Sequence, residues 1–174
     1  MTLKTRKLCC LPLLCAATLS FVAFAAVAQT VSKLTVFASW TVYAGDEAKH
    51  RFCFVTAEPK TSTPANANRD TPRAYISAWP KDGIKSELSF RLGFPVKKDA
   101  EIKVKTDHAA FKLFSKGDRA YVQDPLQELK LVEAMKKGVG LEIEATSEKG
   151  TRVFDTYALA GINQALEAMQ KACF

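Results

Sequence analysis

Cys53 and Cys173 restrict the folds open to this chain more than any other residues, because they lie far apart in the sequence. The first falls near the end of the first third of the chain, and the second is the penultimate residue. A bond between them would close a loop of about 120 residues and tie the end of the chain to an early segment. Whether it forms depends on the compartment, because disulfides persist where the environment is oxidising.

The first 28 residues predict export. A positively charged start, MTLKTRK, precedes a continuous apolar run from residue 8 to about residue 25, and residues 26–28 read Ala-Val-Ala. This order is typical of a secretory signal peptide, with cleavage near Ala28 and before Gln29. An uncleaved membrane anchor stays open as an alternative, because the apolar run approaches the length needed to span a bilayer. A lipid-modified Cys15 is disfavoured, since the leucine before it is too large for the usual lipoprotein cleavage site.

Removal of this leader leaves one predicted domain, residues 29–174, in the periplasm or secreted to the outer envelope. Three of the five cysteines leave with it, so Cys53 and Cys173 are the two that remain. We predict that they form a structural disulfide, and two buried free thiols stay open as the alternative. Three of the 25 basic residues and none of the 18 acidic ones lie in the leader, so the net charge falls from +7 to +4. That charge is typical of a solubilising surface and supports at most peripheral contact with anionic lipid head groups.

Short segments in which apolar and polar residues alternate predict a mainly β protein. Period two with β-branched and aromatic residues indicates strands, and the polar stretch 58–73 with three prolines predicts a surface loop. The predicted strands lie within 34–44, 51–57, 74–80, 86–96 and 118–123, with two more in 101–115 and a hairpin over 139–159. About seven to nine strands should form an antiparallel β-sandwich or distorted barrel.

Two segments change to a helical period and should flank the strands. Residues 125–137 follow Asp124 as N-cap, begin with Pro125 and end before Gly138, while residues 161–172 close the chain. The predicted apolar stripes are Leu126, Leu129, Val132 and Met135 on the first helix, and Ile162, Leu166, Met169 and Cys173 on the second. The second stripe points Cys173 toward the core.

The residues that usually carry chemistry are scattered. His50 and His108 are 58 positions apart, whereas a zinc site needs clustered ligands, so we expect two surface histidines. Glu142 and Glu144 could serve glycoside hydrolysis as a pair, but acids spaced by two are the ordinary result of a solvated sheet face. The sequence contains no Gly-x-Ser-x-Gly elbow and no phosphate-binding loop. We therefore expect no catalytic residues, no cofactor and no metal.

Five lysines make the region from residue 96 to 114 basic, which could mark a contact patch. They are Lys97, Lys98, Lys103, Lys105 and Lys112. Because exposed aromatic residues do not interleave with them, we expect no nucleic-acid binding. Two functions remain open: a non-enzymatic envelope protein that binds a protein or envelope component, and an envelope hydrolase with a dispersed site. The absence of paired nucleophile and base favours the first.

Short motifs spread over residues 34–173 occur in an order that matches a known family. They are Trp40-Thr41-Val42-Tyr43, Cys53, Gly93-Phe94-Pro95, Phe111-Lys112-Leu113-Phe114, residues 131–138, Lys149-Gly150-Thr151, Asp155-Thr156-Tyr157, Leu159, Gly161, Ala165-Leu166 and Cys173. In this order the chain resembles the invasion-associated locus B family of Gram-negative bacteria. The resemblance implies an exported protein of a family named for host-cell invasion in some pathogens, and it supplies no catalytic residues. Some members carry a further cysteine where this chain has Ala44.

Overall fold

The computed structural model describes residues 30–65 and 67–174, so the predicted leader lies outside the described residues. The described part contains eleven strands and two α-helices. The strands are β1 (Thr30–Phe37), β2 (Trp40–Glu47), β3 (His50–Ala57), β4 (Thr61–Thr63), β5 (Arg73–Trp79), β6 (Ile84–Arg91), β7 (Ile102–Thr106), β8 (Ala110–Lys116), β9 (Arg119–Tyr121), β10 (Gly140–Thr146) and β11 (Arg152–Ala158). The helices are α1 (Pro125–Lys137), α2 (Ile162–Cys173) and the short 3-10 turn η1 (Pro80–Asp82).

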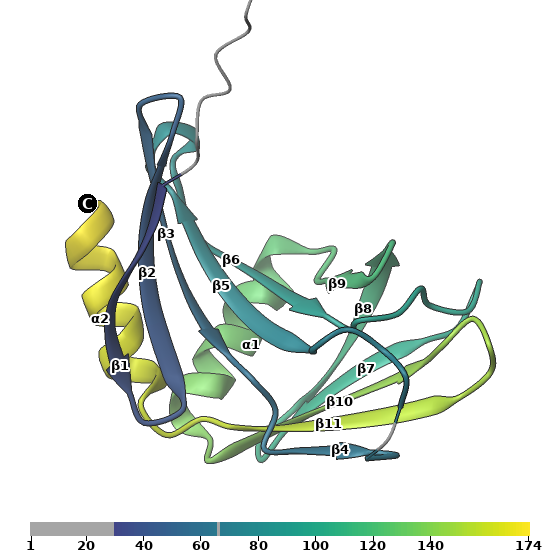
Figure 1. Cartoon of the computed structure of the whole chain (residues 1–174). Helices are drawn as coiled ribbons and strands as arrows, with labels where there is room; N and C mark the ends of the chain where they lie inside the picture. The colour runs from purple at the N-terminus through teal and green to yellow at the C-terminus, as the bar shows by residue number, and fades with distance from the viewer. Residues whose placement is uncertain (1–29, 66) are drawn as a thin grey trace, which may run out of the picture.

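The strands form one bent antiparallel sheet, in the order β1-β2-β3-β5-β6-β9-β8-β7-β10-β11-β4. Figure 1 shows β2, β3 and β5 standing nearly upright, while β7, β10 and β11 run across below them. The indole Nε1 of Trp40 donates to the carbonyl of Ala158 at 3.1 Å, which ties the start of β2 to the end of β11. The predicted antiparallel architecture with two helices is confirmed, and the sheet stays open at its edges β1 and β4.

Alternation along the strands places one core on one side of the sheet. On β3 and β5 the side chains of Cys53, Val55 and Ile76 are fully buried, and the residues between them face the other side. Helix α2 packs against β2 and β3 on the buried side, and α1 contacts β6 and α2. Within the predicted strand 86–96, the alternating residues Leu88, Phe90, Leu92 and Phe94 are buried. This one-sided burial leaves the opposite face of the sheet free for partly exposed side chains.

The chain reverses inside the segment predicted as one strand, 34–44. Ala38 has a positive φ of 49°, and β1 and β2 form a tight hairpin around it. This prediction was wrong because neither turn residue, Ala38 nor Ser39, carries the Gly or Asn signal of a hairpin turn. The prediction of a pure loop over 58–73 was also wrong, since β4 lies within it and pairs with β11.

Helix α1 has the predicted bounds but buries a different stripe. The Asp124 carboxylate accepts a hydrogen bond from the Leu126 amide at 2.8 Å, which confirms the N-cap. Leu126 and Leu129 are 67% and 54% exposed, so that part of the predicted stripe was wrong. The buried residues are Leu131, Val132 and Met135. The helix is rotated so that Leu131, rather than Leu129, faces the sheet.

Helix α2 begins one residue later than predicted and follows its predicted stripe. Ile162 and Met169 are buried, and Leu166 and Cys173 pack against the core while partly exposed. Gly161 precedes the helix with a φ of 90°, where an added Cβ would lie 2.1 Å from the carbonyl oxygen of Phe37. Neither helix of the described chain combines the length and the apolar character that crossing a membrane would take.

Candidate functional site

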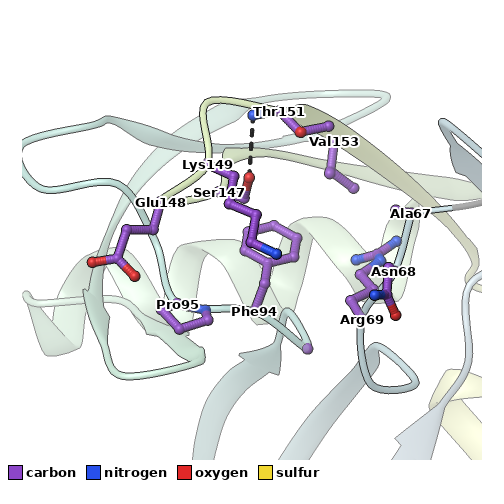
Figure 2. A pocket seen from close by; sticks show the side chains of 11 residues that line it. Ala67, Asn68, Arg69, Phe94, Pro95, Ser147, Glu148, Lys149, Thr151 and Val153 are labelled. Carbon is purple, nitrogen blue, oxygen red and sulfur yellow. Dashed lines mark hydrogen bonds between the residues drawn. The ribbon is translucent and has the colours of Figure 1, made fainter.

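Three segments that are distant in sequence form the walls of one pocket. They are residues 67–69 after β4, residues 93–95 after β6, and the turn between β10 and β11 with the start of β11. The pocket has a volume of about 350 Å³, which is in the range of small-molecule sites. Figure 2 shows its lining side chains converging from these three directions. Two of the three segments, 93–95 and 149–151, are motifs that the sequence analysis had singled out.

The Gly93-Phe94-Pro95 segment is shaped by its glycine. Gly93 has a φ of 78°, and a Cβ at this position would lie 2.0 Å from the carbonyl oxygen of Asp70. Its own carbonyl accepts a hydrogen bond from the Asp70 amide at 3.1 Å. The chain therefore leaves β6 sharply at Gly93 and presents Phe94 and Pro95 to the pocket. The expected continuation of a strand through residues 93–96 was wrong for this reason.

The turn between β10 and β11 is held by its own hydrogen bonds. The Ser147 amide donates to the carbonyl of Thr151 at 2.8 Å, and the Thr151 amide donates to Ser147 Oγ at 3.1 Å. The Glu148 amide donates to the carbonyl of Pro95 at 2.9 Å, which joins the turn to the opposite wall. Gly150 has a φ of 85° at the tip, as a tight turn requires. Two walls of the pocket are therefore fixed to each other through the backbone.

The third wall is anchored by a buried charge cluster. Arg69 and Asp155 form an ion pair whose side chains are 4% and 2% exposed. Arg69 also donates to the carbonyl of Leu92 at 2.9 Å, and Ser62 Oγ donates to Asp155 at 2.6 Å. The guanidinium lies 5.6 Å from the centre of the Phe94 ring. Because the sequence predicted neither the pairing nor β4, this cluster was missed; no spacing pattern links residues 69 and 155.

The side chains that line the pocket do not include the residue types of a His-based catalytic site. Its lining contains no histidine and no cysteine, and Ser147 Oγ is engaged as an acceptor from a backbone amide. Among residues 30–65 and 67–174, no three His, Cys, Asp or Glu side chains gather as a metal would require. The absence of a metal and of catalytic residues stays a prediction. The lining contains no serine–histidine or cysteine–histidine pair.

The two histidines lie apart from this pocket. His50 begins β3 and lines a second hollow of about 380 Å³ together with Glu47 and Asp82. No hydrogen bond or ion pair within the described chain joins His50 to either carboxylate. His108 is exposed in the turn between β7 and β8. Neither histidine has the oriented carboxylate partner that general-base chemistry uses.

The other candidate residues sit on solvated faces. Glu144 pairs with Arg152 on the neighbouring strand, and Glu142 is partly exposed beside it. Glu101 pairs with Lys103 at 3.1 Å and with Lys112 at 2.5 Å. Two lysines of the predicted basic patch thus share the single negative charge of Glu101, and Lys97, Lys98 and Lys105 are exposed.

Cys53 and Cys173 are joined in the structure, with their Cα atoms 6.0 Å apart. The bond links the middle of β3 to the last turn of α2. The side chain of Arg51 donates to the carbonyl of Ala172 at 2.8 Å and holds the same helix end. The two cysteines connect a strand to a helix, and neither of them lines the pocket.

A row of aromatic rings crosses the face of the sheet opposite the core. Tyr43 and Phe54 stack with ring centres 4.9 Å apart, and Phe52 and Trp79 stack at 5.4 Å. The Arg119 guanidinium lies 5.0 Å from the centre of the Tyr75 ring. Because the stacked rings cover one another's faces, we interpret the row as contacts that stabilise the pairing of the strands. The alternating pattern predicted that these residues lie in strands, but it did not predict that they align across three strands.

Comparison with known proteins gives one matching family and a solved structure with a similar fold. The model of the Invasion associated locus B (IalB) protein family matches residues 40–170. The fold is similar to the crystal structure of invasion associated protein B from Bartonella henselae, with a TM-score of 0.58 and 17% sequence identity. That similarity covers 79% of this chain and 97% of the other. No curated protein matches the sequence.

Proposed function

Because this chain belongs to the Invasion associated locus B family, we propose that it is an exported envelope protein that acts by binding and not by catalysis. Its pocket between residues 67–69, 93–95 and 147–153 is the proposed binding site, and its partner is a component of the envelope or of a surface that the envelope meets. The predicted signal peptide supports export to that compartment.

The observation that carries this proposal is the composition of the pocket. Phe94, Pro95 and Val153 supply apolar surface, while Lys149 and Asn68 supply a few polar groups at its edge. This mixture of apolar walls and few polar groups is typical of ligand sites. The pocket walls are held in place by buried contacts and not only by the loops themselves. The site is therefore already formed before a ligand binds.

The hydrolase alternative has less support, because its usual residues do not meet. His50 and His108 lie in different turns and outside the pocket. The hollow that His50 lines with Glu47 and Asp82 has no serine, threonine or cysteine in its lining. A binding role needs no such groups.

Export is tested by the mass of the protein recovered from the periplasm of its native host. We expect the chain to begin at Gln29, since the small residues at 26 and 28 set the cleavage point. An intact chain that begins at Met1 and fractionates with the inner membrane would contradict export.

Binding is tested by a photo-crosslinking amino acid placed at position 68, at the edge of the pocket. In growing cells we expect a discrete adduct at this position. The control carries the same amino acid at position 116, an exposed lysine at the end of β8. The same adducts at both positions, or none at position 68, would contradict a binding role for the pocket.

A further inference from the structure

We infer that the pocket takes a small amphiphilic carboxylate, with the apolar body against Phe94 and the carboxylate on Lys149. This inference rests on the proposed binding function and names its ligand class. It depends on which charges of the pocket are already satisfied and which are free.

The apolar part of the site is a continuous wall. Phe94 and Val153 are 8% and 2% exposed and show the pocket only a small part of their surface, whereas Pro95 is exposed and supplies more of it. Pro95 adds a rigid ring beside Phe94. A ligand that covers this wall removes apolar surface from water, which is the main favourable term in small-ligand binding. The wall therefore selects a ligand with a compact apolar body.

Arg69 is a cation of the pocket that cannot serve a ligand. Its guanidinium is held by Asp155, by Ser62 Oγ at 3.1 Å and by the carbonyl of Leu92 at 2.9 Å. Its charge is neutralised by a carboxylate that is itself buried. Taking Arg69 for a ligand would leave the Asp155 carboxylate buried without a partner, which is costly. Arg69 therefore shapes the wall through its contact with the Phe94 ring.

Lys149 is the cation that remains. None of the ion pairs found in residues 30–65 and 67–174 includes it. Figure 2 shows its side chain directed across the pocket, while the Glu148 carboxylate points away from the pocket. An ammonium group beside an apolar wall favours an anion whose charge sits at one end of an apolar body.

The single free charge and the volume together define the ligand class. One ammonium group matches one carboxylate, whereas a polyanion would find no second free cation in the lining. A volume of about 350 Å³ admits a compact ligand and is too small for a folded partner to enter. The expected ligand is therefore a monocarboxylate with a short aromatic or branched body.

The test uses three ligands with the same body and different head groups: phenylbutyrate, phenylbutanol and phenylbutylamine. The mature protein, labelled with nitrogen-15, is titrated with each, and amide shifts are followed by NMR. We expect phenylbutyrate to bind with a Kd of about 1 mM, at least threefold more tightly than the alcohol and more tightly still than the amine. Shifts should centre on Phe94, Lys149 and Val153.

Two variants separate the role of Lys149 from that of general charge. Lys149→Met keeps the aliphatic stem and should weaken phenylbutyrate binding about three- to tenfold while leaving the alcohol unchanged. Lys98→Met removes the same charge from an exposed lysine outside the lining and should change binding less than about twofold.

The outcomes distinguish this inference from the proposed function. Equal binding of all three ligands at the pocket overturns the carboxylate preference and leaves a binding site in place. An unchanged affinity in Lys149→Met also overturns it. If no ligand binds up to about 10 mM, the ligand class is wrong, and the photo-crosslink at position 68 still decides whether the pocket binds at all.

Discussion

Arg69 and Asp155 form a nearly solvent-free ion pair between two segments that lie 86 positions apart in sequence. The pair joins the connection between β4 and β5 to the middle of β11, where Ser62 also donates to the same carboxylate. It holds one wall of the pocket against the sheet. The geometry of the proposed site therefore depends on a charge pair that is not itself available to a ligand.

Removing one member of this pair should destabilise the protein strongly. Arg69→Met leaves Asp155 buried without a partner and should lower the free energy of unfolding by about 3–5 kcal/mol. Urea denaturation measures the change. As a control, Arg73→Met breaks a more exposed pair with Glu58 and should cost no more than about 1 kcal/mol. Equal effects of the two substitutions would contradict the role of burial.

Gly93→Ala should distort the pocket more than Gly150→Ala, although both glycines have positive φ. At Gly150 no atom lies within 4 Å of an added Cβ, so only backbone strain of about 1 kcal/mol is expected. At Gly93 the added Cβ would meet the carbonyl of Asp70, so a larger loss is expected. Thermal unfolding compares the two variants, and a Gly93→Ala protein as stable as Gly150→Ala would show that the connection yields freely.

Much of the fold could be predicted from local pattern. Alternation identified β5, β6 and β10, and the Asp-Pro start identified α1, because each signal lies within a few residues. The hairpin at Ala38 was missed because it has no Gly or Asn, and β4 because it is only three residues long and lies between Pro59 and Pro64. The rotation of α1 was missed because Leu129 and Leu131 are equally apolar, and only packing against β6 decides between them.

The candidate site was predictable only in pieces. Gly93-Phe94-Pro95 and Lys149-Gly150-Thr151 stood out as motifs, but nothing in the sequence placed them side by side. They lie side by side because of the order of the strands in the sheet. The hydrogen bond from the Glu148 amide to the Pro95 carbonyl joins them. Residues 67–69 joined them through the buried pair with Asp155, a contact set by tertiary structure alone.

The turn between β7 and β8 should make stability depend on pH. The Asp107 carboxylate accepts hydrogen bonds from the amides of Val139 and Gly140, at 2.6 Å and 3.2 Å, and these bonds lower its pKa. A carboxyl whose folded pKa lies below its unfolded value stabilises the fold above the unfolded pKa, and this contribution is lost as the pH falls through the folded pKa.

Asp107→Asn should therefore unfold more easily than the wild type at neutral pH. The difference should shrink as the pH falls below about 4, where the wild-type carboxyl becomes protonated in the unfolded chain and then in the folded one. Urea midpoints across this range measure it. Asp82→Asn removes an equal charge from the η1 turn and serves as control. A difference between Asp107→Asn and wild type that is constant with pH would contradict the assignment.

Loss of the bond between Cys53 and Cys173 should free the last turn of α2. Cys173→Ser should lower the free energy of unfolding by about 2–5 kcal/mol, Cys53→Ser should cost a similar amount, and the double variant little more. Chemical denaturation measures the losses, and non-reducing peptide mapping checks the bond. Labelling of both thiols in unfolded, unreduced protein would show that the bond is absent from the mature chain.

The binding role is tested most directly by mapping where an envelope component touches the labelled mature protein. Amide shifts are recorded before and after addition of detergent-solubilised envelope from the native host. The account predicts shifts at residues 67–69, 93–94 and 147–153. Shifts confined to the aromatic row at Tyr43, Phe54 and Tyr75, or to the hollow lined by His50, would contradict it.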